Sequence, residues 1–319
     1  MKKIFSFFVA FIFYCNVYSQ ITDQPLSGSY NVFSVAGTRT QLWADPVLNE
    51  VLFIHRGTAT GNELLFDVSK DGGTTWTVDQ GPLYSSSTQR PRYPQGVLVN
   101  PSGVPDPDSA FVSFLAPLSS DTPFWTGTVM GQQQVLTGSL PNVEVDTINP
   151  FNHFLPSGYT VTRQGITWSV DGAFVNNVYN NSLIVTKGVW NNATRKFDYS
   201  NQFLNAPVVT TGGISRYQGC NIAFAPDGQV GYVVMNGNDG SISDSVYYPI
   251  VFYTADGGQT WSPPTNIGLN VDPVFGLGSP FYTMGPQFDV AIDAGGSLHL
   301  LCEILEGDNH WNSIFTYGH

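Results

Sequence analysis

A glutamine followed by an apolar strand, a turn with glycine or asparagine and a second apolar strand recurs five times along this chain. The repeat positions are Gln41, Gln95, Gln164, Gln218 and Gln287, at intervals of 54, 69, 54 and 69 residues. A unit of this length exceeds a leucine-rich or ankyrin repeat, but it holds four short antiparallel strands with their loops. The repeat therefore predicts an all-β fold, a β-propeller of four-stranded antiparallel blades.

The first unit resolves into four expected strands, at residues 41–44, 51–56, 63–69 and 75–79. Beyond residue 20 no stretch keeps a 3.6-residue apolar period, and the chain contains 33 Gly and 21 Pro that interrupt helical windows. Charged residues make up only 11% of the chain, which excludes a charge-rich helical bundle or coiled coil. We therefore expect residues 20–319 to form one nearly all-β domain.

A second repeated motif, S/T-x-D-G-G-x-T-W, occurs at residues 69–76 and 254–261. Its aspartate can accept hydrogen bonds from turn amides, its glycines allow positive φ, and its tryptophan can pack back onto the blade. The residues expected to shape these hairpins are Ser69, Asp71, Gly73 and Trp76, and Thr254, Asp256, Gly258 and Trp261. A partial copy at residues 169–172 lacks the tryptophan, so we expect an ordinary turn there.

At these motifs the sequence resembles the Asp-box, or bacterial neuraminidase repeat, proteins, which include sialidases, sortilin-type receptors and xyloglucan-cleaving glycosidases. The resemblance covers most of residues 40–319 and implies a β-propeller whose Asp boxes lie at the blade periphery, so Asp71 and Asp256 are not expected to be catalytic acids. The repeats account for about four and a half blades, whereas closed members usually have six or seven. We therefore expect an incomplete propeller; the alternative is a closing blade that borrows residues 29–36.

The resemblance to sialidases implies a clamp of three arginines that holds a substrate carboxylate, together with a Tyr/Glu pair. Arginines stand one to three residues before four of the repeat glutamines: Arg39, Arg92, Arg163 and Arg216. Of these, Arg39, Arg92 and Arg216 are the clamp candidates, because the planar guanidinium donates two parallel hydrogen bonds to a carboxylate. The alternative is that these arginines bind strand-end carbonyls and brace adjacent blades.

Late in the chain, Tyr282 and Tyr317 are candidates for the tyrosine nucleophile, and Glu303 for its partner. The alternative is that these are ordinary core aromatics and a strand carboxylate, since no motif fixes their mutual distance.

Other chemistries have little support. The chain contains no H-E-x-x-H, paired C-x-x-C, G-x-S-x-G or phosphate-loop motif, so we expect no metal site and no cofactor. Asn236, Asn238 and Asp239 offer oxygen atoms to Ca²⁺, but the loop misses the EF-hand pattern and a solvated loop is the favoured interpretation. Cys220 and Cys302 are too few for a disulfide framework, and we expect two thiols rather than a pair.

The N-terminus indicates the compartment. Lys2 and Lys3, an apolar run at residues 4–14 and a short polar segment ending at Ser19 are typical of a secretory signal, expected to be residues 1–19. No later run is apolar for the roughly 20 residues that span a bilayer. The leader and composition are similar to those of secreted proteins of gliding bacteria, so we expect a secreted or cell-surface bacterial protein. The net charge of -12 disfavours nucleic acid as a partner.

Three functions are compatible with these observations. The first is an extracellular recognition module that binds a glycan or a protein. The second is an exo-acting glycoside hydrolase of sialidase type. The third is a surface adhesion protein that uses aromatic loops at residues 124–125 and 151–154.

Overall fold

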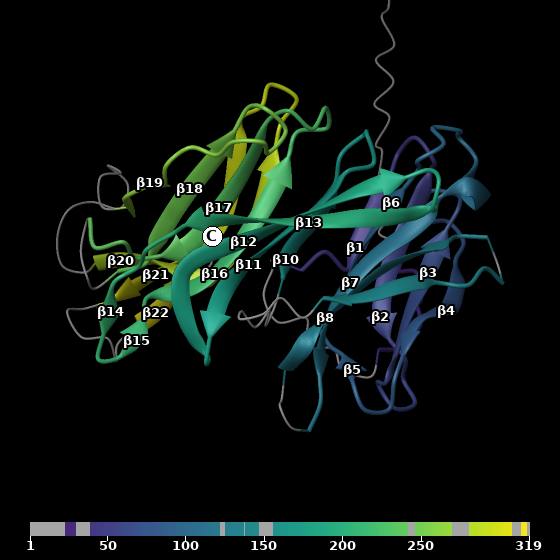
Figure 1. Ribbon diagram of the computed structural model, residues 1–319, viewed down its shortest axis with the longest axis horizontal. Helices are drawn as coiled ribbons and strands as arrows, with labels where there is room; N and C mark the ends of the chain where they lie inside the picture. The colour runs from purple at the N-terminus through teal and green to yellow at the C-terminus, as the bar shows by residue number, and fades with distance from the viewer. Residues whose placement is uncertain are drawn as a thin grey trace, which may run out of the picture.

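The computed structural model describes residues 23–29, 39–121, 125–136, 138–146, 156–241, 246–269, 281–307 and 314–317. Within these residues the chain is all-β apart from one 3₁₀ turn, Pro107–Ser109. The strands form five antiparallel sheets that follow one another in chain order (Figure 1), and we call these sheets blades 1 to 5.

Each blade is built from consecutive strands. Blade 1 contains β1 (Leu42–Asp45), β2 (Glu50–Arg56), β3 (Glu63–Ser69) and β4 (Thr77–Ser85). Blade 2 contains β6 (Gln95–Val99), β7 (Phe111–Ser119), β8 (Trp125–Gln134) and β9 (Asn142–Asp146), and β5 (Arg90–Pro91) also pairs with β7. Blade 3 contains β10 (Ser157–Val161), β11 (Thr167–Val175), β12 (Val178–Asn191) and β13 (Lys196–Asn205).

The last two blades follow a small ribbon formed by β14 (Thr210–Thr211) and β15 (Ile214–Ser215). Blade 4 contains β16 (Tyr217–Phe224), β17 (Gly231–Gly237), β18 (Tyr248–Thr254) and β19 (Thr265–Asn266). Blade 5 contains β20 (Phe281–Ile292), β21 (Leu298–Gly307) and β22 (Ile314–Tyr317).

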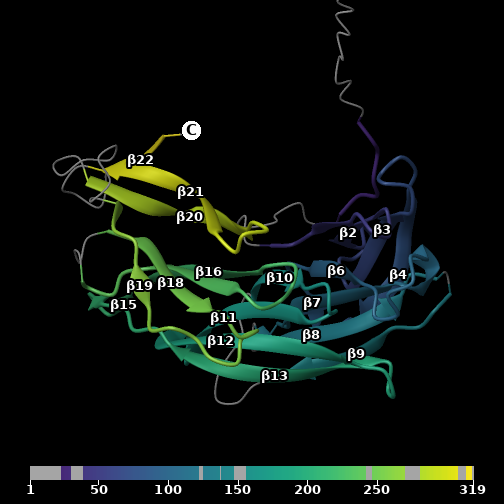
Figure 2. The same cartoon turned by 90° about the horizontal axis from the view of Figure 1, so that it is seen from above.

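The blades are arranged around a common channel. The innermost strands β1, β10, β16 and β20, or the residues directly beside them, line one cavity. Figure 2 shows β20–β22 across from β2 and β3. The predicted propeller of four-stranded antiparallel blades is confirmed: blades 1, 3 and 4 have four strands each, blade 2 has four and the short β5, and the described part of the fifth has three.

The hydrophobic core is divided among the interfaces between blades. Four buried clusters are present, one at each junction between consecutive blades. At the junction of blades 3 and 4, for example, the rings of Trp168 and Phe224 stack with centroids 4.3 Å apart. β7 lies between two such interfaces, and all nine of its residues are buried. Because burying a large apolar side chain contributes about 1.5–3 kcal/mol, each blade depends on its neighbours for stability.

Four of the five repeat glutamines lie where the repeat predicts. Gln41 directly precedes β1, Gln95 opens β6, and Gln218 and Gln287 lie in β16 and β20. Gln164 is the exception, because it lies in the turn between β10 and β11. The prediction for this unit was wrong because the long apolar strand β11 masks the shorter β10, which is the true inner strand.

Strand boundaries show two further differences. The first three strands of blade 1 match the prediction to within one residue, but the fourth is Thr77–Ser85 rather than 75–79. Residues 169–172, expected to form a turn, lie within β11 instead. Burial of β11 between two blades overrides the turn preference of Asp171 and Gly172, and Asp171 is only 4% exposed.

The two repeated hairpins have the same hydrogen bonds. In the first, Asp71 Oδ1 accepts bonds from the Ser69 hydroxyl (2.8 Å) and the Thr75 N–H (2.8 Å), and Asp71 Oδ2 accepts one from the Thr75 hydroxyl (2.7 Å). In the second, Asp256 accepts the corresponding bonds from Thr254 and Thr260 at 2.6–2.9 Å. The bonds from Thr75 hold the pKa of Asp71 down at about 2.

Other features of the sequence can now be placed. Cys220 and Cys302 are free thiols, buried for Cys220 and half-buried for Cys302. Within the described residues, no helix is both long and apolar enough to cross a bilayer. The signal segment at residues 1–19, and all of residues 29–36 but Ser29, lie outside the described residues.

One buried amide joins three blades. Gln95 is 0% exposed, and its Oε1 accepts hydrogen bonds from the Thr40 N–H (3.2 Å) and the Tyr159 N–H (3.2 Å). Its Nε2 donates to the Pro156 carbonyl. Thr40 leads into blade 1 and Tyr159 belongs to blade 3, so this side chain of blade 2 satisfies backbone groups on both neighbours.

We predict that Asp71→Asn destabilises the protein at neutral pH and that the difference from wild type shrinks as the pH falls. The reason is that the lowered pKa of Asp71 makes its contribution complete above an ordinary aspartate pKa of about 3.9 and lost toward pH of about 2. Urea unfolding midpoints at neutral and acid pH measure this, with the exposed Asp23→Asn as control. A difference independent of pH would contradict the prediction.

We predict that Gln95→Ala lowers the free energy of unfolding by about 1–3 kcal/mol, because it leaves buried backbone groups without partners. Gln164→Ala is the matched control: the Gln164 side chain is exposed, its Nε2 donates to the Asp227 carbonyl, and its loss is expected to change stability by less than about 0.5 kcal/mol. Denaturant unfolding followed by tryptophan fluorescence distinguishes the two, and equal losses would refute the bridging role of Gln95.

Candidate functional site

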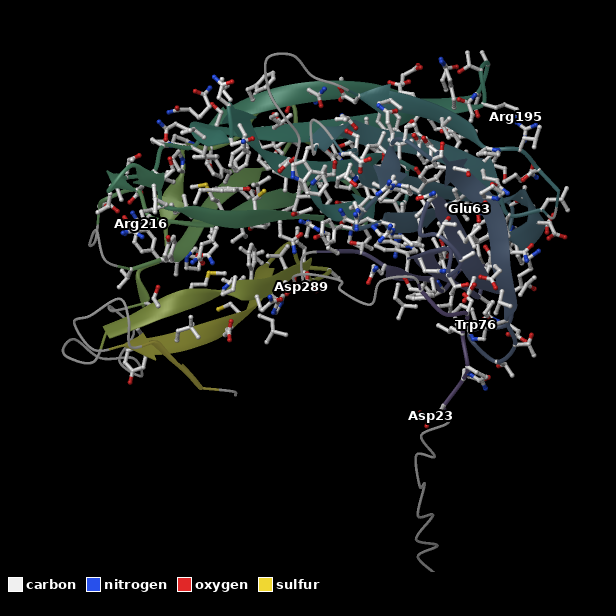
Figure 3. The ribbon with its side chains drawn as sticks, turned by 90° about the horizontal axis from the view of Figure 1, so that it is seen from below. Asp23, Glu63, Trp76, Arg195, Arg216 and Asp289 are labelled. Atoms are coloured by element: carbon white, nitrogen blue, oxygen red, sulfur yellow. The ribbon has the colours of Figure 1, made fainter. Side chains whose placement is uncertain are left out.

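The central channel holds a cavity of about 480 Å³. One wall comes from blade 1 and the residues before it, including Arg39, Trp43 and Phe53, and the opposite wall includes Asn221 of β16 and Asp289 of β20. Figure 3 shows Asp289 at the inner end of blade 5, close to the centre of the molecule. The cavity therefore combines aromatic rings with a small number of polar groups, the usual composition of a small-molecule site.

Asn221 and Asp289 form a hydrogen-bonded pair across blades 4 and 5. Asn221 Nδ2 donates to Asp289 Oδ1 (3.1 Å), and Asn221 Oδ1 accepts the N–H of Ile222 (2.8 Å). Asp289 Oδ1 also accepts the N–H of Val290 (2.8 Å). These bonds fix the carboxylate in one orientation while the residue stays exposed. Asp289 is also one of the residues that line the cavity.

Gly158 sets how closely β10 approaches β16. Its φ is +63°, and a Cβ atom there would overlap Asn221 Oδ1 and lie 2.6 Å from the backbone nitrogen of Ile222. A glycine is therefore required for both conformation and space, and it keeps Asn221 in the position that orients Asp289.

Arg39 connects blades 1 and 3 at the channel. Its Nη1 donates to the Pro156 carbonyl (2.8 Å) and to the Ser157 hydroxyl. Burial lowers the pKa of the guanidinium below its usual value, and the nearby carboxylate of Asp171 opposes part of that shift. Arg39 therefore supplies positive charge to the wall while also fixing the start of β10.

Asp171 is a residue of this region that the sequence analysis missed. It lies on β11, is 4% exposed, and its Oδ1 accepts the N–H of Gly172 (2.7 Å). An acidic residue inside the otherwise apolar segment Thr167–Val175 was the available signal, because buried carboxylates occur chiefly beside compensating charge.

An aromatic cluster lies beside Arg39 and Asp171. The rings of Tyr179 and Tyr217 stack with centroids 4.3 Å apart, and the Tyr217 hydroxyl lies 3.2 Å from Cys220 Sγ. Burial raises the pKa of Tyr217 well above its usual value, so the phenol stays protonated. This cluster supports the channel wall rather than supplying a phenolate nucleophile.

The structure does not bring the predicted arginine clamp together. Arg92 Nε donates to the Ser119 hydroxyl (3.0 Å) at the end of β7, whereas Arg39 binds the start of blade 3. Arg216 lies between β15 and β16, and Figure 3 shows it well apart from Asp289. Arg163 is exposed in the β10–β11 turn. The contact of Arg39 with the Pro156 carbonyl matches the alternative in which arginines bind strand-end carbonyls and brace adjacent blades.

The predicted Tyr/Glu pair is also not assembled among the described side chains. Tyr282 of β20 opposes Glu306 in the register of β21, not Glu303. Glu303 packs over Gly285, where a Cβ atom would overlap its carboxylate. The side chain of Tyr317 lies outside the described residues, although its backbone pairs with Ile304.

The loop considered for Ca²⁺ uses its side chains in protein hydrogen bonds. Asn236 Nδ2 donates to Gln218 Oε1 (2.9 Å) and the Gly285 carbonyl (2.8 Å), which directs this amide toward blade 5. Asn238 Oδ1 accepts the Gly240 N–H (2.7 Å), and Asp239 Oδ1 accepts the Tyr248 hydroxyl (2.6 Å). These hydrogen bonds connect the loop to β18 and to blade 5.

No protein-family model matches the chain, and no curated protein matches it. Among solved structures it is similar to an exo-β-1,3-galactanase from Phanerochaete chrysosporium (9% identity, TM-score 0.45) over 88% of this chain and 63% of that one. It is also similar to an endo-arabinase from Bacteroides thetaiotaomicron (12% identity, TM-score 0.45; 88% of this chain, 93% of that one). A third is a polysaccharide lyase, ulvan lyase (12% identity, TM-score 0.46; 83% and 61%). Likeness this distant carries no argument about activity, which depends on the residues described above.

We predict that Gly158→Ala destabilises the protein by more than Gly103→Ala. The two glycines have similar φ values, +63° and +66°, so the backbone strain is matched, but a Cβ atom at Gly103 meets nothing within 4 Å. The excess therefore measures the overlap with Asn221, and about 1–3 kcal/mol is expected for such overpacking. Thermal unfolding of both variants provides the measurement, and equal losses would show that β10 does not constrain Asn221.

Proposed function

We propose that the protein is an extracellular recognition module that binds a neutral oligosaccharide in its central channel. The observation that carries the proposal is the channel lining, where Trp43 and Phe53 lie in the same cavity as Asn221 and Asp289. The extracellular setting rests on the sequence pattern of residues 1–19.

The chemistry of the lining suits a sugar. An aromatic ring supplies an apolar face for the C–H groups of a pyranose, and a carboxylate or amide binds its hydroxyl groups. Asp289 is exposed and oriented by Asn221, so its second oxygen can accept a hydroxyl hydrogen bond without rearrangement. A charge-assisted bond of this kind is roughly twice as strong as a neutral one.

Charge favours a neutral sugar over an acidic one. The chain has a net charge of -12, and Asp289 contributes a carboxylate directly to the cavity. Arg39 lines the cavity as well, but its Nη1 already donates to blade 3 and Asp171 lies nearby. A sialoside carboxylate would therefore meet one engaged arginine instead of three converging ones.

The lining favours binding over hydrolysis. Glycoside hydrolases place two carboxyl groups on either side of the scissile bond, about 5–10 Å apart. Among the described residues that line the cavity, Asp289 is the one acidic residue. The adhesion alternative depends partly on residues 124 and 151–154, which lie outside the described residues; the ring of Trp125 is tilted by 40° against that of Tyr93, with centroids 6.2 Å apart.

We predict that Asp289→Ala weakens oligosaccharide binding about tenfold, as expected for loss of one charge-assisted hydrogen bond worth about 1.5 kcal/mol. A glycan array that carries neutral and sialylated oligosaccharides identifies the tightest neutral ligand, and isothermal titration calorimetry then gives affinities for wild type and variant. Asp198→Ala is the matched control, because Asp198 is an exposed acid of the outer strand β13.

Absence of binding to every neutral oligosaccharide, or equal affinities for wild type and Asp289→Ala, would refute the proposal. Incubation of the same ligand with wild-type protein, followed by chromatography of the products, separates recognition from catalysis. Release of free sugar, or turnover of a sialoside, would support the hydrolase instead.

A further inference from the structure

Blade 1 contains a compact group of metal-binding side chains away from the channel cavity. His55 of β2, Asp67 of β3 and Asp79 of β4 come from three adjacent strands, and their ligand atoms all lie within 4.8 Å of one another. The side chains of His55 and Asp67 are 0% exposed, whereas that of Asp79 is 55% exposed. The group is therefore built into the blade and reachable from solvent on one side.

The contacts of His55 determine where its free electron pair points. Its Nδ1 lies 3.2 Å from the carbonyl oxygen of Arg56, and a carbonyl only accepts hydrogen bonds, so Nδ1 carries a hydrogen. Its Nε2 faces Asp67 Oδ1 at 3.1 Å and Asp79 Oδ1 at 3.7 Å. Carboxylate oxygens only accept hydrogen bonds, so Nε2 either donates a hydrogen to Asp67 as part of an imidazolium or directs its electron pair at a cation held between the oxygens.

Zn²⁺ fits the second of these arrangements in both distance and charge. Zinc–ligand bonds of about 2.0–2.1 Å in a tetrahedron place the ligand atoms about 3.3 Å apart, close to the 3.1 and 3.7 Å observed. Two carboxylates and a neutral imidazole balance the charge of one divalent cation. A carbonyl that holds the other ring nitrogen is also the usual outer contact of a metal-bound histidine.

Ser27, in the segment that precedes blade 1, lies on the fourth side of the group formed by His55, Asp67 and Asp79. The Ser27 hydroxyl lies 2.8 Å from His55 Nε2 and 2.7 Å from Asp67 Oδ1, and the Ser27 N–H donates to Asp67 Oδ2 (2.9 Å). An ion here would connect residues 23–29 with three strands of blade 1. Ca²⁺ and Mg²⁺ prefer all-oxygen sites, so the imidazole selects against them.

We propose that His55, Asp67 and Asp79 bind one Zn²⁺ ion, with the Ser27 hydroxyl beside the fourth coordination position, and that the ion stabilises the attachment of residues 23–29 to blade 1. The ligands are spaced 12 residues apart along three strands, which matches no short zinc motif. The expectation that the chain holds no metal site rested on such motifs.

The test uses the tag-free, chelator-treated full chain. Isothermal titration with ZnCl₂ is expected to show one saturable site, and the melting temperature is expected to rise with Zn²⁺ concentration but not with CaCl₂ or MgCl₂ at equal concentration. Asp79→Asn is expected to fold, because this side chain is half exposed, and to weaken Zn²⁺ binding at least tenfold. His55→Gln is expected to abolish binding.

His299→Gln is the matched control, because His299 Nε2 and Asp293 Oδ2, 3.0 Å apart, form the other histidine–carboxylate contact recorded among the described residues and are both largely exposed. This variant should bind Zn²⁺ as wild type does. The proposal is overturned if wild type shows no saturable binding, if Asp79→Asn binds equally well, or if His299→Gln loses the site.

Discussion

Among the described residues no blade has a core of its own, and that constraint governs the rest of the structure. The buried clusters lie between consecutive sheets, so every apolar face needs the next blade. Polar groups at these junctions must then be satisfied by the neighbouring blade, as Gln95 does for Thr40, Pro156 and Tyr159. The side chains that position the channel are consequently the same ones that hold the blades together.

This double role explains why the channel geometry is well defined. Arg39 reaches from blade 1 to Pro156, and Asn221 of blade 4 orients Asp289 of blade 5. Each contact crosses a blade boundary, so a rigid-body shift of one blade would break it. The lining of the cavity is therefore preorganised by packing between blades, which lowers the conformational entropy that the protein loses when a ligand binds.

The fold was largely predictable from sequence, but the site was not. The spacing of the repeat and the alternation within strands predict the five blades, because both are local features of the sequence. They fail at Gln164, because the burial of β11 between two blades is a tertiary effect. The site depends on which blade faces which. In the sequence, Asp171 and Asp289 resemble any turn aspartate. The three predicted arginines stand at equivalent positions before their repeat glutamines but lie at different places in the structure, since equivalent positions on different blades point to different junctions.

The surroundings of each aspartate depend on where it lies within its blade. At the periphery, Asp71 and Asp256 are saturated by hairpin hydroxyl and amide groups, so these carboxylates have a structural task and little capacity for a ligand. Within the sheet of blade 1, His55 faces Asp67 and Asp79, the group proposed to bind a cation. In the channel, Asp289 has one oxygen engaged by Asn221 and is exposed. Hydrogen-bond donors surround Asp71 and Asp256, an imidazole faces Asp67 and Asp79, and solvent reaches Asp289. These three environments suit a structural role in the hairpins, the proposed metal ligands and the proposed sugar contact, in that order.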